Sequence, residues 1–143
     1  MDRRSLQGPQ EVLTSEDSIW CSARAEAFAL ELGFDSRAAA EVAIAVSELV
    51  SNSLKYAERG RLELLAIDRP KRGLEVVQTD DGPGIEDIER AVVDGYSRGH
   101  LVVTHEPGGL GVGLGAVRRL MDEVTIENQP GGGLRVCARK WLG

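Results

Sequence analysis

The segment Glu41–Ala57, EVAIAVSELVSNSLKYA, decides the fold because it has the length and periodicity of one amphipathic helix. Its apolar stripe, the side that a helix turns toward a core, recurs at spacings of four, three and four: Val42, Val46, Leu49 and Ser53. A polar set, Glu48, Asn52 and Lys55, recurs at spacings of four and three. At about 100° per residue, this set falls more than about 100° from the stripe. Ala45 lies at the edge of the polar face and leaves room above it.

The polar set has the functional groups of a site for a metal ion and phosphates. Asn52 offers a side-chain oxygen to Mg²⁺, which prefers a few protein oxygens together with water and phosphate oxygens. Glu48, one turn earlier, is placed to accept a proton from an attacking hydroxyl or water. Lys55 fits the neutralisation of a phosphate, and equally an exposed position at a helix end. The three residues taken alone also fit a solvated helix face.

Length and composition bound the function. The chain has 143 residues, 42% of them hydrophobic and 28% charged, which is typical of one soluble globular domain. The formal net charge is -6, and no basic stretch is longer than Arg3-Arg4. This argues against a nucleic acid or an anionic membrane as a partner held by charge. Any ATP bound here needs local positive groups or a divalent cation.

The two cysteines, Cys21 and Cys137, do not form a metal or redox motif. One disulfide between them is possible, although two lone cysteines are more typical of buried thiols in a reducing compartment. The N-terminal residues lack the apolar run of a signal peptide, and no stretch reaches the length of a membrane span. We therefore expect a cytoplasmic protein.

The N-terminal half reads as an arm followed by two helices. We expect a flexible arm over residues 1–10 and a single domain over residues 11–143. Residues 11–14 fit a short edge strand. Thr14 or Ser15 fits the N-cap of a helix that runs through Ile19, Ala23, Ala27 and Leu30 and ends near Gly33. Asp35 or Ser36 fits the N-cap of the helix quoted above, and Gly60 its stop signal.

Two hairpins complete the expected fold. Alternating apolar residues predict strands over Arg61–Asp68 and Gly73–Thr79, and again over Val124–Glu127 and Leu134–Ala138. Hairpins imply antiparallel pairing, and the helices must then cover one face of the sheet. The sequence therefore predicts an α+β fold, a two-layer α/β sandwich in which helices cover one face of a mixed sheet.

The segment Asp80–Ile85, DDGPGI, directly follows the second strand. A carboxylate at a strand end can accept a hydrogen bond from an exocyclic amine such as that of adenine. Gly82 and Gly84 let the backbone approach a flat ligand closely, while Pro83 stiffens the turn. Taken alone, the segment also fits a plain acidic turn. We expect a short helix over residues 86–94 and a mobile loop over residues 95–108.

The segment Gly108–Leu114, GGLGVGL, opens a helix that continues to Met121. Its glycines leave backbone amides able to point at anions, and the helix N-terminus adds a favourable dipole. The same glycines fit a hinge or close helix packing. Because no βαβ order surrounds them and no Lys-Ser/Thr follows, they are neither a Rossmann fingerprint nor a P-loop.

At these residues the sequence resembles the GHKL ATPase superfamily with its Bergerat ATP-binding fold. Glu48-x-x-x-Asn52 resembles the N box, Asp80-x-Gly82 with Gly84 the G1 box, and the glycines at 109, 111 and 113 the G2 box. The resemblance implies that Asp80 holds the adenine amine, Asn52 the Mg²⁺, and that Glu48 is the catalytic base. The other residues that we expect around ATP are Lys55, Gly82, Gly84, Ile85, Gly109, Leu110, Gly111, Val112, Gly113 and Leu114.

Within the superfamily the chain most resembles the RsbT-type serine/threonine kinases of stressosome switches. The matching segments are Asp94–Ser97, Val117–Glu123 and Lys140–Leu142. The resemblance implies ATP-dependent phosphorylation of a STAS-domain protein and activation of a PP2C-type phosphatase by binding. The alternatives are an RsbW-type anti-sigma factor, whose partner is a sigma factor, and a nucleotide-dependent binding module without efficient transfer. Residues 97–108 are longer than this family's pattern, which fits a fuller ATP lid or a different partner.

Overall fold

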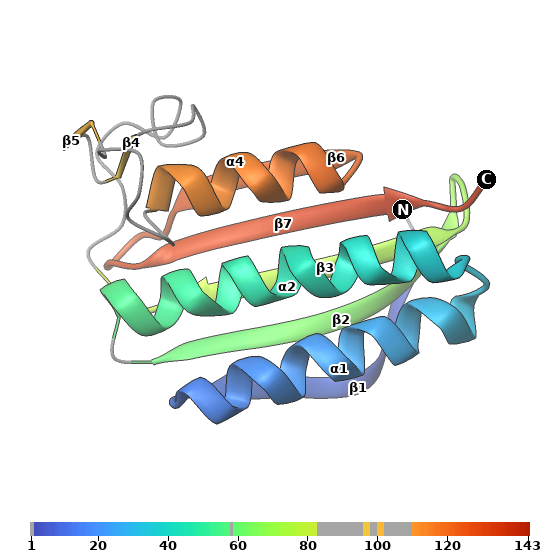
Figure 1. The fold of residues 1–143 in the computed structure, drawn as a ribbon, viewed down its shortest axis with the longest axis horizontal. Helices are drawn as coiled ribbons and strands as arrows, with labels where there is room; N and C mark the ends of the chain where they lie inside the picture. The colour runs from blue at the N-terminus through green and yellow to red at the C-terminus, as the bar shows by residue number, and fades with distance from the viewer. Residues whose placement is uncertain (1, 58, 83–95, 98–99, 102–109) are drawn as a thin grey trace.

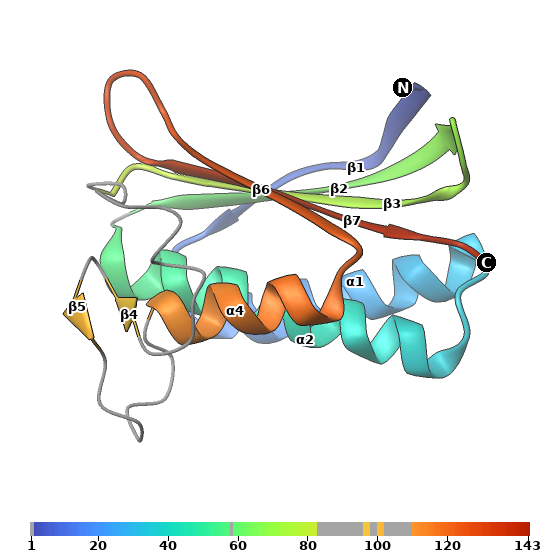
Figure 2. The same ribbon diagram turned by 90° about the horizontal axis from the view of Figure 1, so that it is seen from above.

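The computed structural model describes residues 2–57, 59–82, 96–97, 100–101 and 110–143. The helices are α1 (Ser15–Leu32), α2 (Ser36–Tyr56) and α4 (Leu110–Leu120). The strands of the main sheet are β1 (Asp2–Val12), β2 (Gly60–Arg69), β3 (Gly73–Asp80), β6 (Glu123–Asn128) and β7 (Leu134–Trp141). Figures 1 and 2 show α1, α2 and α4 side by side on one face of this sheet. The predicted α+β two-layer sandwich is confirmed.

The sheet has five strands in the order β1-β2-β3-β7-β6. Each of its four pairings is antiparallel, so the sheet is not the mixed one that we expected. The predicted hairpins are both present, and each of their strands is slightly longer than predicted. The core lies between the sheet and the helices and includes Leu62, Leu64, Leu74 and Val76, as the alternation of the two central strands predicts.

We expected residues 1–10 to be a loose arm, but residues 2–10 form most of β1. Strand β1 pairs with β2 from Asp2↔Arg69 to Val12↔Gly60, with shifts of register along the way. It is the edge strand of the sheet, and Val12 at its end is buried in the core. Backbone pairing holds this polar segment, whose sequence lacks the alternation of a strand.

Helix α1 begins and ends where its caps predict. The Asp17 carboxylate accepts hydrogen bonds from the backbone N–H of Leu13 and Thr14, at 2.8 and 2.9 Å, and Gly33 ends the helix with a φ of 108°. The residues that α1 buries are Cys21, Ala25, Phe28 and Ala29. The apolar period that indicated this helix, which includes Ile19 and Leu30, therefore lies on its outer side.

Helix α2 is the middle helix, and it packs against both α1 and α4. The Asp35 side chain caps it by accepting from the Ala38 N–H at 2.8 Å. Because α2 has neighbours on both sides, Asn52 is only 6% exposed. Glu48 is half-buried and Lys55 exposed. The expectation that these three residues share one face well separated from the core is therefore wrong for Asn52.

We expected Gly60 to end α2, but it is the first residue of β2. The helix ends at Tyr56, and its C-cap Ala57 has an extended backbone with a φ of −137°. A Cβ on Gly60 would run into the Ser53 Oγ and the Gln78 Nε2. The glycine is required because the strand passes this close to α2.

Between β3 and α4 the structure describes only two short strands, β4 (Tyr96–Ser97) and β5 (His100–Leu101), which pair antiparallel. The short helix expected over residues 86–94 and most of the loop expected over residues 95–108 lie outside the described residues. Cys21 and Cys137 are buried and are not joined by a disulfide, and burial raises the pKa of the Cys21 thiol. No helix in the described part of the chain is long and apolar enough to cross a membrane.

Candidate functional site

The ends of three secondary-structure elements and one hairpin connection lie at the same end of the molecule. The C-terminal ends of α2 and β3, the N-terminal end of α4 and the connection between β6 and β7 all lie toward that end in Figures 1 and 2. The first three carry the residues of the predicted N, G1 and G2 boxes. The fold therefore gathers segments that are far apart in the sequence.

A buried hydrogen bond joins the end of α2 to the end of β3. The Gln78 Nε2 donates to the Ser53 Oγ at 2.8 Å and also lies 3.2 Å from the Thr79 carbonyl oxygen. Ser53 is next to Asn52 in sequence, and Gln78 is two residues before Asp80. This contact therefore ties the N box to the G1 box.

The contacts of Lys140, a residue of β7, show which side of α2 faces α4. The Lys140 Nζ donates to the Leu120 carbonyl oxygen at 2.6 Å and pairs with the Glu41 carboxylate at 3.7 Å. Glu41 therefore lies on the α4 side of α2. Glu48 and Asn52 follow it by seven and eleven residues, which is close to two and three helical turns of about 3.6 residues. Both side chains consequently lie on the side of α2 that faces α4.

Asn52 is a buried amide without a hydrogen-bond partner among the described residues. Within the described part of the chain, neither its Oδ1 nor its Nδ2 makes a hydrogen bond, and the same holds for the Gln78 Oε1. Leaving a buried polar group unpaired costs about 1–3 kcal/mol. Such a group fits a ligand that supplies the missing contacts, and a side-chain oxygen is a donor that Mg²⁺ accepts.

Asp80 is held firmly at the end of β3. Its Oδ1 accepts from the backbone N–H of Gly82 at 2.9 Å and of Leu134 at 3.2 Å. The next residue, Asp81, exchanges two hydrogen bonds with the backbone of Arg59, at 2.9 and 3.2 Å. These contacts fix the start of the G1 turn against the segment between α2 and β2.

Gly133 belongs to this arrangement, although the sequence analysis assigned it only to a hairpin loop. Its φ is +100°, and a Cβ there would run into the Asp80 carbonyl oxygen. Its neighbour Leu134 supplies the N–H that binds the Asp80 carboxylate. The run Gly131–Gly133 was the one sequence feature that pointed to a close approach here.

The other predicted site residues lie in several places. Lys55 is exposed in the last turn of α2. Residues 110–113 form the first turn of α4, so Gly111 and Gly113 stand at a helix N-terminus as predicted, and Leu114 is fully buried in the core. Three of the predicted positions, Gly84, Ile85 and Gly109, lie outside the described residues.

Two solved structures have a similar fold. The chain is similar to the solved structures of the mycobacterial sensor histidine kinase MprB and of the catalytic domain of the histidine kinase ThkA. The TM-scores are 0.54 and 0.55 at 20% and 15% identity, and each match covers 94% of this chain and 100% or 96% of the other. The architecture is thus that of histidine-kinase catalytic domains.

Residues 20–140 match the family described as histidine kinase-like ATPase domains, and the chain belongs to that family. It is 37% identical over 132 residues to the serine/threonine-protein kinase RsbT of Bacillus subtilis, a match that covers 92% of this chain and 93% of the relative. It is also 32% identical over 122 residues to the anti-sigma F factor of Caldanaerobacter subterraneus, covering 82% and 80%. The predicted resemblance to GHKL ATPases and RsbT-type kinases is confirmed, and so is the expectation of a kinase at the level of the family.

Proposed function

We propose that this protein is an ATP-dependent serine/threonine-protein kinase of a bacterial sigma-factor or stress switch, and that its substrate is a STAS-domain protein. The observation that carries the proposal is the buried Asn52 amide, which has no hydrogen-bond partner in the described part of the chain. It lies on the α4 side of α2 and beside the end of the strand that carries Asp80. The similarity to a serine/threonine-protein kinase supports the choice of reaction.

In this proposal each segment at the site end holds one part of the nucleotide. Asp80 accepts a hydrogen bond from the adenine amine, and the glycines of the G1 turn with Ile85 form the rim around the base. The amides at the start of α4 face the phosphates, where the helix dipole favours negative charge. Asn52 holds a Mg²⁺ ion, and Lys55 adds positive charge near the phosphates. Bound Mg²⁺ neutralises charge on the phosphate oxygens.

Glu48 acts on the acceptor. The bond between the γ-phosphorus and the oxygen that bridges to the β-phosphate breaks, and a new bond forms to the serine or threonine hydroxyl oxygen. Glu48 orients that hydroxyl and accepts its proton, leaving a phosphorylated partner and ADP. Phosphoryl transfer depends chiefly on positioning, and the firm placement of α2 against β3 and α4 supports such a role. The kinase released from its substrate would bind and activate a PP2C-type phosphatase.

A second function is favoured by the similarity to an anti-sigma factor. In this alternative the protein binds a sigma factor, and the nucleotide sets the shape of its binding surface. Efficient phosphoryl transfer is then not required.

The test is transfer of label from γ-labelled ATP with Mg²⁺ to a purified STAS-domain protein. We expect labelled phosphoserine or phosphothreonine, and a fall of about 10²–10⁴-fold in rate for Glu48→Gln. Glu41→Gln is the matched control, because Glu41 lies on the same side of α2 but pairs with Lys140. Tight binding of the partner with no transfer of label would overturn the kinase proposal in favour of the binding module.

A further inference from the structure

The outer side of α1 exposes an apolar surface that the fold does not use. Ile19, Trp20 and Leu30 are 74%, 58% and 49% exposed, and Ala23 and Ala27 between them are exposed as well. We call these five residues the outer α1 face. Single exposed apolar side chains are ordinary, but a contiguous group of them marks an interaction site.

The spacing of the outer α1 face matches the packing of one helix on another. Trp20, Ala23, Ala27 and Leu30 recur at three, four and three residues, the spacing of a helix–helix seam. Small alanines in the middle allow a second helix to approach closely, while the tryptophan and the leucine offer large anchors at the two ends.

The apolar surface continues onto α2. The Ser22 Oγ donates to the Ala43 carbonyl oxygen at 3.0 Å, which fixes this part of α1 against α2. Ile44, the next residue of α2, is 51% exposed. A helix lying along α1 would therefore find an apolar neighbour on its α2 side as well.

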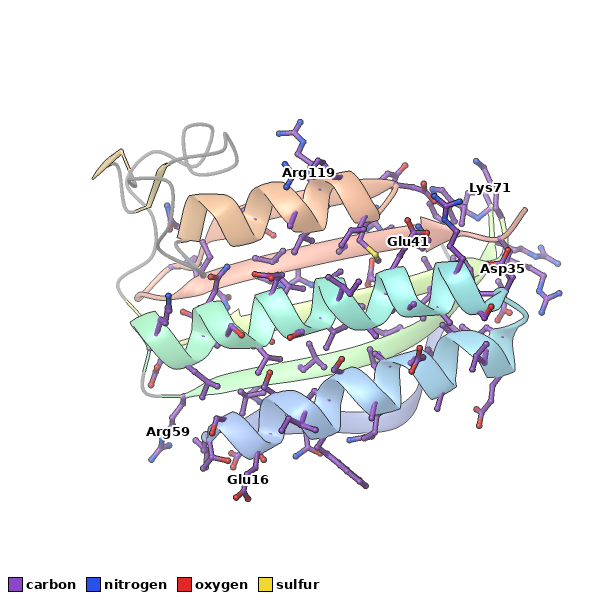
Figure 3. The ribbon with its side chains drawn as sticks, viewed as in Figure 1. Glu16, Asp35, Glu41, Arg59, Lys71 and Arg119 are labelled. Carbon is purple, nitrogen blue, oxygen red and sulfur yellow. The ribbon has the colours of Figure 1, made fainter. Side chains whose placement is uncertain are left out.

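The border of the outer α1 face is acidic. Glu16, Glu26 and Glu31 are all exposed, and within the described residues none of them forms an ion pair. In Figure 3 the Glu16 side chain projects outward from α1 on the side opposite α2. The single basic residue of α1, Arg24, donates to the Gln10 side chain of β1 at 2.8 Å and so reaches toward the edge of the sheet.

We propose that the outer α1 face docks an amphipathic helix of a partner protein whose apolar stripe is flanked by lysine or arginine. Basic side chains beside that stripe would meet the three carboxylates at the border. A second copy of this chain fits less well, because its α1 would bring the same carboxylates against these. The proposed surface is separate from the site described above and does not depend on the proposed kinase activity.

The probe is a labelled synthetic helical peptide of about 18 residues, with leucines at heptad spacing and lysines on both borders. Binding is measured by fluorescence anisotropy. We expect the lysine-bordered peptide to bind and a glutamate-bordered version to bind more than about tenfold more weakly. Added salt should weaken the first complex.

Two sets of substitutions distinguish the contribution of shape to peptide binding from the contribution of charge. Ala23→Gln with Ala27→Gln fills the space above the alanines without adding charge, and we expect more than about tenfold weaker binding. Glu26→Gln with Glu31→Gln should weaken only the lysine-bordered peptide. The matched control is Thr125→Gln, an exposed position on β6, which should bind as the parent does. Unchanged melting temperatures show that the variants are folded.

Three results would overturn the proposal: no binding of the lysine-bordered peptide, equal binding of both peptides, or binding that survives the two alanine substitutions. Sedimentation of the parent chain adds a fourth. If it shows a dimer that the alanine substitutions dissociate, the outer α1 face is an interface between copies, and the proposed partner is wrong.

Discussion

Two buried polar side chains near the central strand differ in one respect. Glu75 of β3 is 0% exposed and its carboxylate accepts from the Arg139 Nε at 2.6 Å. Arg139 also reaches the Glu123 carboxylate at 3.3 Å, and the hydrogen bond that Arg139 donates to Glu75 raises the pKa of the arginine. Asn52 of α2 is 6% exposed and has no hydrogen-bond partner within the described residues.

We interpret Glu75 as a structural group and Asn52 as a residue of the proposed nucleotide site. A buried charge that is paired and hydrogen-bonded completes the fold by itself. A buried amide left unpaired lowers stability, so a protein that keeps one has another use for it. In our proposal these polar atoms at the site end serve a ligand, whereas the Glu75–Arg139 pair is part of the scaffold.

The largest expected effect on stability comes from breaking the hydrogen-bonded pair of Glu75 and Arg139. Arg139→Met takes the arginine's hydrogen bond and charge away from the buried Glu75 carboxylate, and we expect a loss of about 3–5 kcal/mol in the free energy of unfolding. Urea denaturation measures it. The control is Arg135→Met on the same strand, which removes the 3.2 Å pair with the exposed Glu127 and should cost about 1 kcal/mol or less. Equal losses in the two variants would contradict the distinction.

Gly133→Ala comes next, because it disturbs the residue that supports Asp80. A φ of +100° strains alanine by about 1–3 kcal/mol, and the added Cβ also meets the Asp80 carbonyl oxygen. Gly131→Ala is matched, since its φ is +89° and nothing lies within 4 Å of an added Cβ. We expect Gly133→Ala to cost more stability in urea denaturation and to weaken nucleotide binding, whereas Gly131→Ala should show the strain alone.

Asn52→Leu tests whether the Asn52 amide, unlike the Glu75–Arg139 pair, contributes nothing to stability. Leucine has a similar size and no polar atoms to satisfy, so without nucleotide the stability should stay the same or rise by up to about 1 kcal/mol. Urea denaturation in the absence of nucleotide decides this. A loss as large as that of Arg139→Met would show that Asn52 is part of the scaffold instead.

The substitution Asp17→Asn should have the smallest effect on stability, because it removes only the hydrogen bonds at the start of α1. The N–H groups of Leu13 and Thr14 favour its charged form and hold its pKa below the ordinary 3.8. A carboxylate with a lowered folded pKa contributes stability above its unfolded pKa, and that contribution is lost as the pH falls through the folded value. Asp17→Asn should therefore lower the melting temperature at neutral pH, and the difference from the parent should shrink below a pH of about 3.8. A difference that stays constant with pH would contradict this.

Local patterns predicted the elements and missed the contacts between them. The caps at Asp35 and Gly33 and the alternation of β2 and β3 are local, so the helices and the hairpins followed from the sequence. The burial of Asn52 was not predictable in that way, because it depends on α2 lying between two other helices. Strand β1 was missed because backbone pairing with β2, and not its own side-chain pattern, holds it.

In the candidate site, too, some features could be predicted from local sequence patterns and others could not. The spacing of Glu48 and Asn52 and the place of Asp80 at a strand end could be read from the sequence. The hydrogen bond from Leu134 to Asp80 joins residues 54 positions apart, and the Glu75–Arg139 pair joins residues 64 apart, so no local pattern indicates either. The close approach at Gly60 belongs to the same kind of contact.

Calorimetric titration of Mg·ATP into the parent chain and into Asn52→Leu tests the central claim most directly. We predict that the parent binds the nucleotide and that Asn52→Leu binds it more than about tenfold more weakly, a difference of about 1.4 kcal/mol, while both remain folded. We also predict that removing Mg²⁺ with EDTA brings the two affinities together. Equal affinity in the presence of Mg²⁺, or no binding to the parent, would contradict the assignment of the unpaired amide to a metal-bound nucleotide.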